Sequence, residues 1–155
     1  IAAAAVRYYL LRFGLNTEIV FDIKQATEVT GNTGVYLLYS YTRGYNILKK
    51  AGVQQWEAPE DLNLAELSLS ERLILRHMIT WPDVVEVALR DVAPNLICNY
   101  AFELSSLFNN FYAACPVLQE TDEEKRAFRL WLTSVYTQHL AEVLGIIGLP
   151  TPEEM

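Results

Sequence analysis

The chain has 155 residues, of which 52% are hydrophobic and 20% charged, and its formal net charge is −7. This composition can supply the core of one domain of ordinary size and argues against intrinsic disorder. The acidic balance argues against a general nucleic-acid binder and against a DNA partner, but it leaves room for a local basic site. No apolar run approaches the length of a membrane span, so no membrane partner is expected.

Residues 1–12 are expected to form the end of a helix that Gly14 stops. This apolar start has neither an initiator methionine nor a basic leader, so it does not resemble a signal peptide. We interpret it as a stretch inside a longer protein, where a helix is already under way. A short extended piece is then expected at residues 18–21, and Asp22 should open a brief helix to about Val29.

The next predicted helix carries the most unusual pattern of the sequence. Asn32 or Thr33 can cap its start, it continues to about Lys50, and Gly52 stops it. At 100° per residue, one face gathers aromatic, cationic and amide side chains, namely Tyr36, Tyr39, Arg43, Asn46 and Lys50. The opposite face is expected to be the core face and holds Leu37, Leu38, Tyr41, Tyr45 and Leu48.

The segment around this helix is free of acidic residues between Glu28 and Glu57, although the chain as a whole is acidic. Aromatic rings interleaved with cations suit stacking on unpaired bases and contact with phosphate. The pattern therefore predicts a local RNA-binding face.

Residues 53–67 are expected to form an acidic connector that contains Pro59. Ser68 and Glu71 then have the spacing of a capping box at the start of a helix. Its predicted buried stripe consists of Leu67, Ile74, Met78, Trp81 and Val85. Pro82 should bend or break this helix, because proline removes an amide donor and crowds the preceding turn.

Pro94 suits the first turn of a further helix that Pro116 ends. Its core face is predicted to hold Tyr100, Leu104, Leu107, Phe108 and Phe111. Thr121 and Glu124 are expected to form a second capping box before the last long helix. That helix should bury Phe128, Leu132, Val135, His139 and Val143.

Four substantial helices with short connections predict an all-α fold, a helical bundle. Its core is expected to include Leu37, Tyr41, Ile74, Met78, Trp81, Leu104, Phe108, Leu132 and Val135.

The reactive side chains do not add up to an autonomous enzyme. His77 and His139 have no metal-ligand companion at a useful spacing, and His139 is expected to be a core histidine. Cys98 and Cys115 lie in apolar helical surroundings, so buried free thiols and a reducing, cytoplasmic compartment are expected. The sequence has no phosphate-cradling glycine loop and no Gly-x-Ser-x-Gly elbow. We expect no catalytic residue, metal site or cofactor in this chain.

Residues 31–43 resemble the Gly-Asn-Thr-x-x-Tyr-x-Gln-Tyr-x-x-x-Arg segment of arginyl-tRNA synthetases, which are class I aminoacyl-tRNA synthetases. Residues 126–130 resemble the motif that gives the DALR anticodon-binding domain its name. Further segments are similar in the family's order, namely residues 6–8, 21–22, 100–108, 111–112, 115–118 and 152–155. The resemblance therefore covers essentially the whole chain.

This resemblance implies that residues 31–155 form a DALR-type anticodon-binding bundle and that residues 1–30 end the region joining it to a catalytic body. The full-length protein would use ATP and Mg²⁺ to attach arginine to tRNA(Arg). The chain itself would bind the anticodon stem-loop of tRNA(Arg) without catalysing the reaction. The alternative is a helical protein-interaction module derived from the same fold, with no RNA role.

The resemblance also implies roles for individual residues. Tyr36, Tyr39 and Arg43 fall on the family's anticodon-side positions, Arg129 on the DALR arginine, and Met155 on the terminal methionine near the anticodon loop. Three positions depart from the family's pattern, namely Val35 for proline, Leu38 for glutamine and Glu154 for arginine. Two alternatives stay open: the two tyrosines could pack against residues 1–30, and the DALR arginine could fix helix packing instead of contacting RNA.

Overall fold

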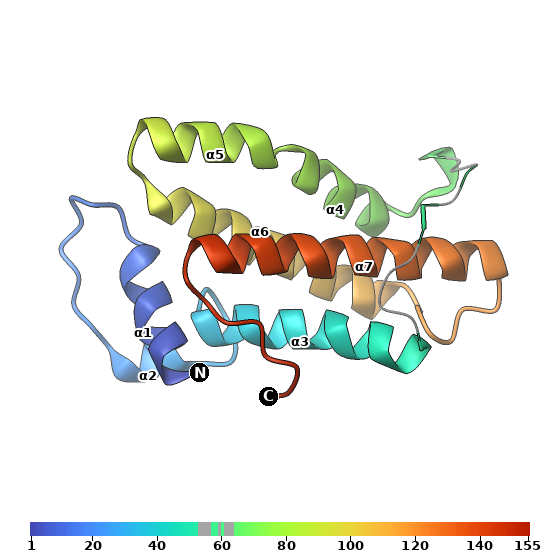
Figure 1. Ribbon diagram of the computed structural model, residues 1–155, viewed down its shortest axis with the longest axis horizontal. Helices are drawn as coiled ribbons and strands as arrows, with labels where there is room; N and C mark the ends of the chain where they lie inside the picture. Colours follow the sequence, from blue (N-terminus) through green and yellow to red (C-terminus); the bar gives the residue numbers. More distant parts are fainter. Residues whose placement is uncertain (53–56, 59, 61–63) are drawn as a thin grey trace.

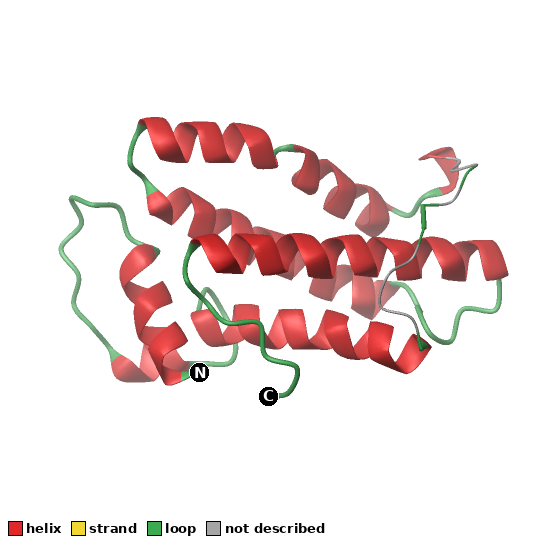
Figure 2. Ribbon diagram, viewed as in Figure 1, coloured by secondary structure: helices red, strands yellow, loops and turns green. Residues whose placement is uncertain are grey.

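The computed structural model describes residues 1–52, 57–58, 60 and 64–155, so much of the predicted acidic connector lies outside the described residues. The described residues form α-helices and one short 3-10 turn, without a strand, which confirms the predicted all-α fold (Figure 2). The elements are α1 Ala2–Leu11, α2 Ile23–Thr27, α3 Gly34–Ala51, η1 Leu64–Glu66, α4 Leu69–Ile79, α5 Trp81–Arg90, α6 Pro94–Ala114 and α7 Glu123–Ile146.

The three longest helices form the body of the bundle (Figure 1). Helix α3 packs against α7 and α6, while α4 and α5 lie together along α6. Helix α1 crosses one end of the bundle, where it contacts α2, α3 and α6. After α7 the chain turns back, and its C-terminal tail passes over α3 (Figure 1).

Most helix ends follow the local signals in the sequence. At the start of α3, the Thr33 hydroxyl accepts a hydrogen bond from the backbone amide of Tyr36. Gly52 ends that helix in the left-handed conformation, with a φ of 81°. Both hydrogen bonds of the capping box at Ser68 and Glu71 are present. In the first helices, Asp22 caps α2 as predicted, but α2 ends at Thr27, and residues 18–21 have no regular structure.

Two predictions about helix ends have different outcomes. The chain does break near Pro82, because α4 ends at Ile79 and α5 begins at Trp81, which places the proline in the first turn of α5. The prediction of a capping box at Thr121 and Glu124 is wrong. Helix α7 begins one residue later than that box requires, and the carboxylate of Asp122 accepts the backbone amides at the start of the helix.

The core confirms five of the nine predicted residues as fully buried, namely Leu37, Ile74, Leu104, Phe108 and Leu132. Tyr41, Met78 and Trp81 pack against this core but are only partly buried. The prediction of Val135 as a core residue is wrong, since it borders an apolar hollow between α4 and α7. Its neighbour Tyr136 is the buried residue instead, because α7 turns that position toward α3 and α6.

Helix α3 approaches α7 closely through small residues that the predicted core face did not include. Ser40 is buried and lies 2.6 Å from the Tyr136 hydroxyl, and the Tyr136 ring stacks on Phe108 at 3.8 Å. A Cβ atom on Gly44 would lie 2.4 Å from the Thr137 hydroxyl, closer than atoms can pack. This contact turns Tyr41 and Tyr45 to the edge of the bundle, where they are half-buried.

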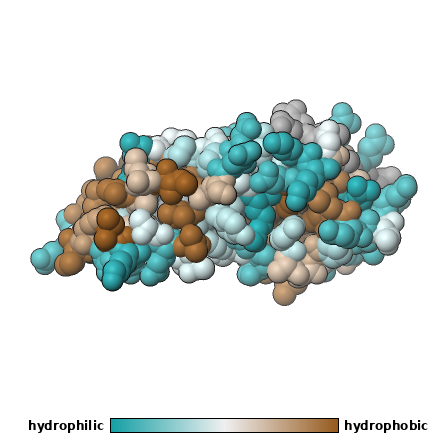
Figure 3. All heavy atoms as spheres, turned by 90° about the horizontal axis from the view of Figure 1, so that it is seen from below, coloured by the Kyte–Doolittle hydropathy of each residue, from teal (hydrophilic) through white to brown (hydrophobic). Residues whose placement is uncertain are grey.

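The N-terminal region has a buried side and an exposed apolar side. Tyr8 is fully buried against α3, and its hydroxyl lies 3.0 Å from the carbonyl oxygen of Cys98. This region also has exposed apolar residues, namely Ile1, Val6, Leu10, Leu15, Val20, Phe21, Ile23 and Val29. Figure 3 shows hydrophobic surface at the α1–α2 end of the molecule. Across the described part of the chain, no helix combines the length and apolarity needed to span a membrane.

Candidate nucleic-acid interface

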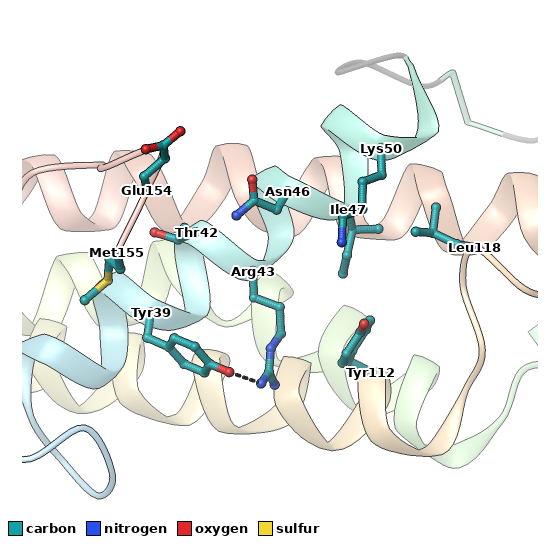
Figure 4. A pocket seen from close by; sticks show the side chains of 10 residues that line it. All are labelled: Tyr39, Thr42, Arg43, Asn46, Ile47, Lys50, Tyr112, Leu118, Glu154 and Met155. Atoms are coloured by element: carbon teal, nitrogen blue, oxygen red, sulfur yellow. Dashed lines mark hydrogen bonds between the residues drawn. The ribbon is translucent and has the colours of Figure 1, made fainter.

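A hollow of about 430 Å³ lies beside the exposed face of α3 (Figure 4). Five of the seven site residues predicted from the sequence line it, namely Tyr39, Arg43, Asn46, Lys50 and Met155. The rest of the lining comes from Thr42, Ile47, Tyr112, Leu118 and Glu154. Helix α3, helix α6, the connection after α6 and the C-terminal tail thus all contribute to one site.

Arg43 is the central cation of this hollow. Its guanidinium donates to the Asn109 side-chain oxygen at 2.7 Å and to the Tyr39 hydroxyl. The guanidinium carbon lies 4.7 Å from the centre of the Tyr39 ring and 5.2 Å from that of Tyr112, which are cation–π distances. Among the described residues, no carboxylate forms an ion pair with Arg43. Neutral groups hold the guanidinium in place, and no ion pair compensates its charge.

Tyr39 presents the aromatic surface of the site, since 43% of the residue is exposed. That exposure leaves the residue accessible to a ligand and does not fit the alternative in which it packs against residues 1–30. Tyr36 is half-buried and does not line the hollow: its ring packs on Phe102 of α6, and its hydroxyl accepts a hydrogen bond from Asn109. The two tyrosines therefore share a helix face but have different environments.

The C-terminal tail closes one side of the hollow. The Thr42 hydroxyl donates to the carbonyl oxygen of Pro152 at 2.9 Å and so ties the tail to α3. This contact brings the half-exposed Met155 and the carboxylate of Glu154 to the rim, as Figure 4 shows. Lys50 is exposed at the far end of the hollow. The rim therefore carries both signs of charge, with the cations on α3 and an acid on the tail.

Arg129 lies elsewhere, in the interior between α7, α4 and the connection after α6. Only 9% of it is exposed, and its guanidinium donates to carboxylate oxygens of Glu71 and Glu120 and to the carbonyl oxygen of Pro116. This position agrees with the alternative in which the DALR arginine fixes helix packing. Sequence reasoning could not separate the two roles, because the Glu71 partner is 58 positions away.

The pKa of Glu71 reflects this ion pair. Burial by itself raises the pKa of the carboxyl, but hydrogen bonds from Arg129 and from Ser68 outweigh it and hold the pKa below its ordinary value of 4.5. The carboxylate serves both the capping box of α4 and the ion pair with α7. It is therefore a structural link between two helices.

The two histidines belong to an aromatic cluster on the other side of the bundle. The Tyr100 hydroxyl lies 2.7 Å from His139 Nε2, and its ring stacks on His77 at 4.4 Å. Burial lowers the pKa of His139 below its ordinary value of 6.5, as expected for a histidine against the core. Within the described residues, no three metal-binding side chains come together.

The sequence reasoning missed several residues of the hollow, among them Tyr112, and it missed Asn109 behind Arg43. Tyr112 lies in a segment that carried the family resemblance, so the resemblance could have drawn attention to it. Asn109 carried no signal, because its importance lies in bridging Arg43, Tyr36 and Ser40 across two helices.

Comparisons with known proteins agree with this architecture. An arginine–tRNA ligase of Vibrio parahaemolyticus is 33% identical over all of this chain, and one of Pyrococcus abyssi is 35% identical. This chain spans 26% and 25% of their lengths. The solved structure of Thermus thermophilus arginyl-tRNA synthetase aligns with 98% of this chain and 26% of its own, with a TM-score of 0.87 and 28% identity. The family described as the DALR anticodon binding domain matches residues 37–155, and the chain belongs to that family.

Proposed function

We propose that the hollow beside α3 binds the anticodon loop of tRNA(Arg), and that the chain is the anticodon-binding part of an arginine–tRNA ligase. The observation that carries this proposal is the convergence of Tyr39, Arg43, Asn46, Lys50 and Met155 on one hollow. The names of the similar proteins supply the substrate class.

The chemistry of the hollow suits an unpaired loop of RNA. The exposed ring of Tyr39 offers a stacking platform for a base, which is typically worth about 1–3 kcal/mol per base. Arg43 and Lys50 supply cations for phosphate, and the thioether of Met155 adds an apolar contact at the rim. Arg129 is left out of this binding surface, because its guanidinium already faces two carboxylates in the interior.

The full-length protein would attach arginine to tRNA(Arg) with ATP and Mg²⁺, and that chemistry would belong to a catalytic body outside this chain. We propose that residues 1–30 lead to that body and that the exposed apolar side of α1 and α2 faces it. Burial of this apolar surface would be favourable by about 25 cal/mol per Å². The two free, buried cysteines fit a reducing, cytoplasmic compartment.

The test is a fluorescence-anisotropy titration of the chain with labelled anticodon stem-loops. A stem-loop carrying an arginine anticodon should bind more tightly than stem-loops with the same stem and other anticodons. Binding should weaken as salt rises, because phosphate contacts release counterions. Tyr39→Ala should weaken binding while the circular dichroism spectrum stays helical. Equal affinity for all anticodons, or an affinity that does not respond to salt, would contradict the proposal and favour a protein-interaction module.

A further inference from the structure

We propose that Asn109 is a positioning residue for the RNA-binding surface. It fixes Arg43 and the Tyr36 hydroxyl in place and links them to the buried core, while leaving the cation of Arg43 unneutralised. This inference rests on the proposed function of the hollow beside α3, but it concerns a residue of α6 that does not line that hollow.

The orientation of the Asn109 amide follows from its neighbours. Arg43 has only hydrogen-bond donors, so the atom that faces it at 2.7 Å must be the side-chain oxygen. The amide nitrogen then points the other way and donates to the Tyr36 hydroxyl at 2.9 Å and to the Ser40 hydroxyl at 3.3 Å. Both ends of the amide are therefore used, which holds the side chain in one orientation.

The bridge reaches the buried core of the molecule. Ser40 is fully buried and lies 2.6 Å from the Tyr136 hydroxyl of α7. Tyr136 is itself fully buried and stacks on Phe108, with an angle of 6° between the rings. A continuous chain of hydrogen bonds thus runs from α7 through α3 and α6 to the guanidinium at the surface. Such a network rigidifies the groups that it connects.

The neutral amide has a second consequence for binding. A carboxylate at position 109 would also hold Arg43, but it would neutralise the guanidinium charge that is proposed to bind the RNA phosphate. The amide positions the guanidinium without compensating its charge. The Asn109 nitrogen also occupies an acceptor position of the Tyr36 hydroxyl, so that hydroxyl keeps its own proton for donation to another group.

The experiment measures the affinity of the chain for a tRNA(Arg) anticodon stem-loop at several salt concentrations. Asn109→Ala removes the bridge, and Asn109→Asp keeps the acceptor for Arg43 but adds a negative charge. Asn110→Ala is the matched control, because Asn110 is an exposed asparagine on the same helix. Arg43→Ala, alone and combined with Asn109→Ala, shows whether Asn109 acts through the guanidinium.

We expect Asn109→Ala to weaken binding about tenfold, which corresponds to one lost hydrogen bond to a charged group. Its salt dependence should fall toward that of Arg43→Ala, an effect that a purely structural residue would not produce. Combined with Arg43→Ala, it should weaken binding by much less than the product of the two single effects. Asn109→Asp should bind at least as weakly as Asn109→Ala, and Asn110→Ala should bind like the wild type.

The role of Asn109 is overturned if Asn109→Ala and Asn109→Asp bind within twofold of the wild type while Arg43→Ala is weakened. It is also overturned if the effects of Asn109→Ala and Arg43→Ala multiply, because the two residues would then act independently. If the wild type and Arg43→Ala bind equally well, the role of Asn109 fails, because there is then no guanidinium contact for it to position. The proposed function fails separately, if the wild type binds all anticodons equally or does not respond to salt.

Discussion

Arg43 and Arg129 both project from long helices and are both held by hydrogen bonds, but their partners differ in charge. Arg129 lies in the interior and faces the carboxylates of Glu71 and Glu120. Arg43 lies beside the surface hollow and is held by an amide, a phenol and two aromatic rings. The first arrangement neutralises the cation in the fold, whereas the second leaves the charge for a ligand.

The comparison shows how an acidic chain can keep a cation at its surface without an ion-pair partner. Its formal net charge is −7, yet none of the carboxylates in the described residues forms an ion pair with Arg43. The helix face suggested Arg43 as an RNA contact, and the family resemblance suggested Arg129. The chemistry of their partners separates a structural arginine from one available for binding.

The largest effect is expected from Arg129→Ala, which leaves Glu71 buried without its partner. Breaking a buried ion pair in this way costs about 3–5 kcal/mol of unfolding free energy. Urea unfolding followed by circular dichroism measures it. Arg129→Ala combined with Glu71→Ala should recover part of the loss, because the buried carboxylate of Glu71 is then gone and only the Glu120 carboxylate lacks its partner. A loss below about 1 kcal/mol for the single variant would contradict the structural role.

The second effect tests the close contact between α3 and α7 beside Arg43. Gly44→Ala should destabilise the protein by about 1–3 kcal/mol, because the added methyl group would overlap the Thr137 hydroxyl. Gly145→Ala is the control, since a Cβ atom there meets nothing within 4 Å. That substitution should be neutral or stabilise the helix by up to about 1 kcal/mol. Equal melting temperatures for the two variants would show that the helices are not packed as described.

The third effect concerns Arg43, where a substitution should reduce RNA binding much more than stability. Arg43→Ala should weaken binding of a tRNA(Arg) stem-loop by about 1.5 kcal/mol, with a smaller dependence on salt. Its unfolding free energy should change by less than about 1 kcal/mol, because its partners are neutral and close to the surface. A stability loss as large as that of Arg129→Ala would erase the distinction between the two arginines.

The smallest effect is a difference in the pH dependence of stability. The folded pKa of Glu71 lies below its ordinary value of 4.5, so its contribution is complete above that pH. The contribution is lost as the pH falls through the folded pKa, when the carboxylate binds a proton. Between pH 7 and about pH 3.5, the free energy of unfolding should therefore decrease more for the wild type than for Glu71→Gln. Parallel losses would mean that the ion pair with Arg129 does not set this pKa.

Local signals in the sequence were sufficient for much of the fold. The caps at Thr33 and Ser68, the left-handed Gly52 and the break near Pro82 each depend on atoms within about one helical turn. The periodicity of α3 also placed Tyr39, Arg43, Asn46 and Lys50 on one face, and these four residues line the hollow. The periodicity of α7 predicted Val135 as a core residue, but its neighbour Tyr136 is the buried one. The packing of α7 against α3 and α6 decides which of the two is buried.

By itself, the sequence determined the all-α class, the limits of most helices and the aromatic, cationic face of α3, because these features arise from spacing along the chain. The tertiary structure decided which partners the charged side chains have. Glu71 reaches Arg129 across 58 positions, Asn109 reaches Arg43 across 66, and Pro152 meets Thr42 across 110. Such contacts depend on how the helices pack, and no local periodicity encodes them, so the difference between an arginine neutralised by carboxylates and one held by neutral groups emerged only in the folded molecule.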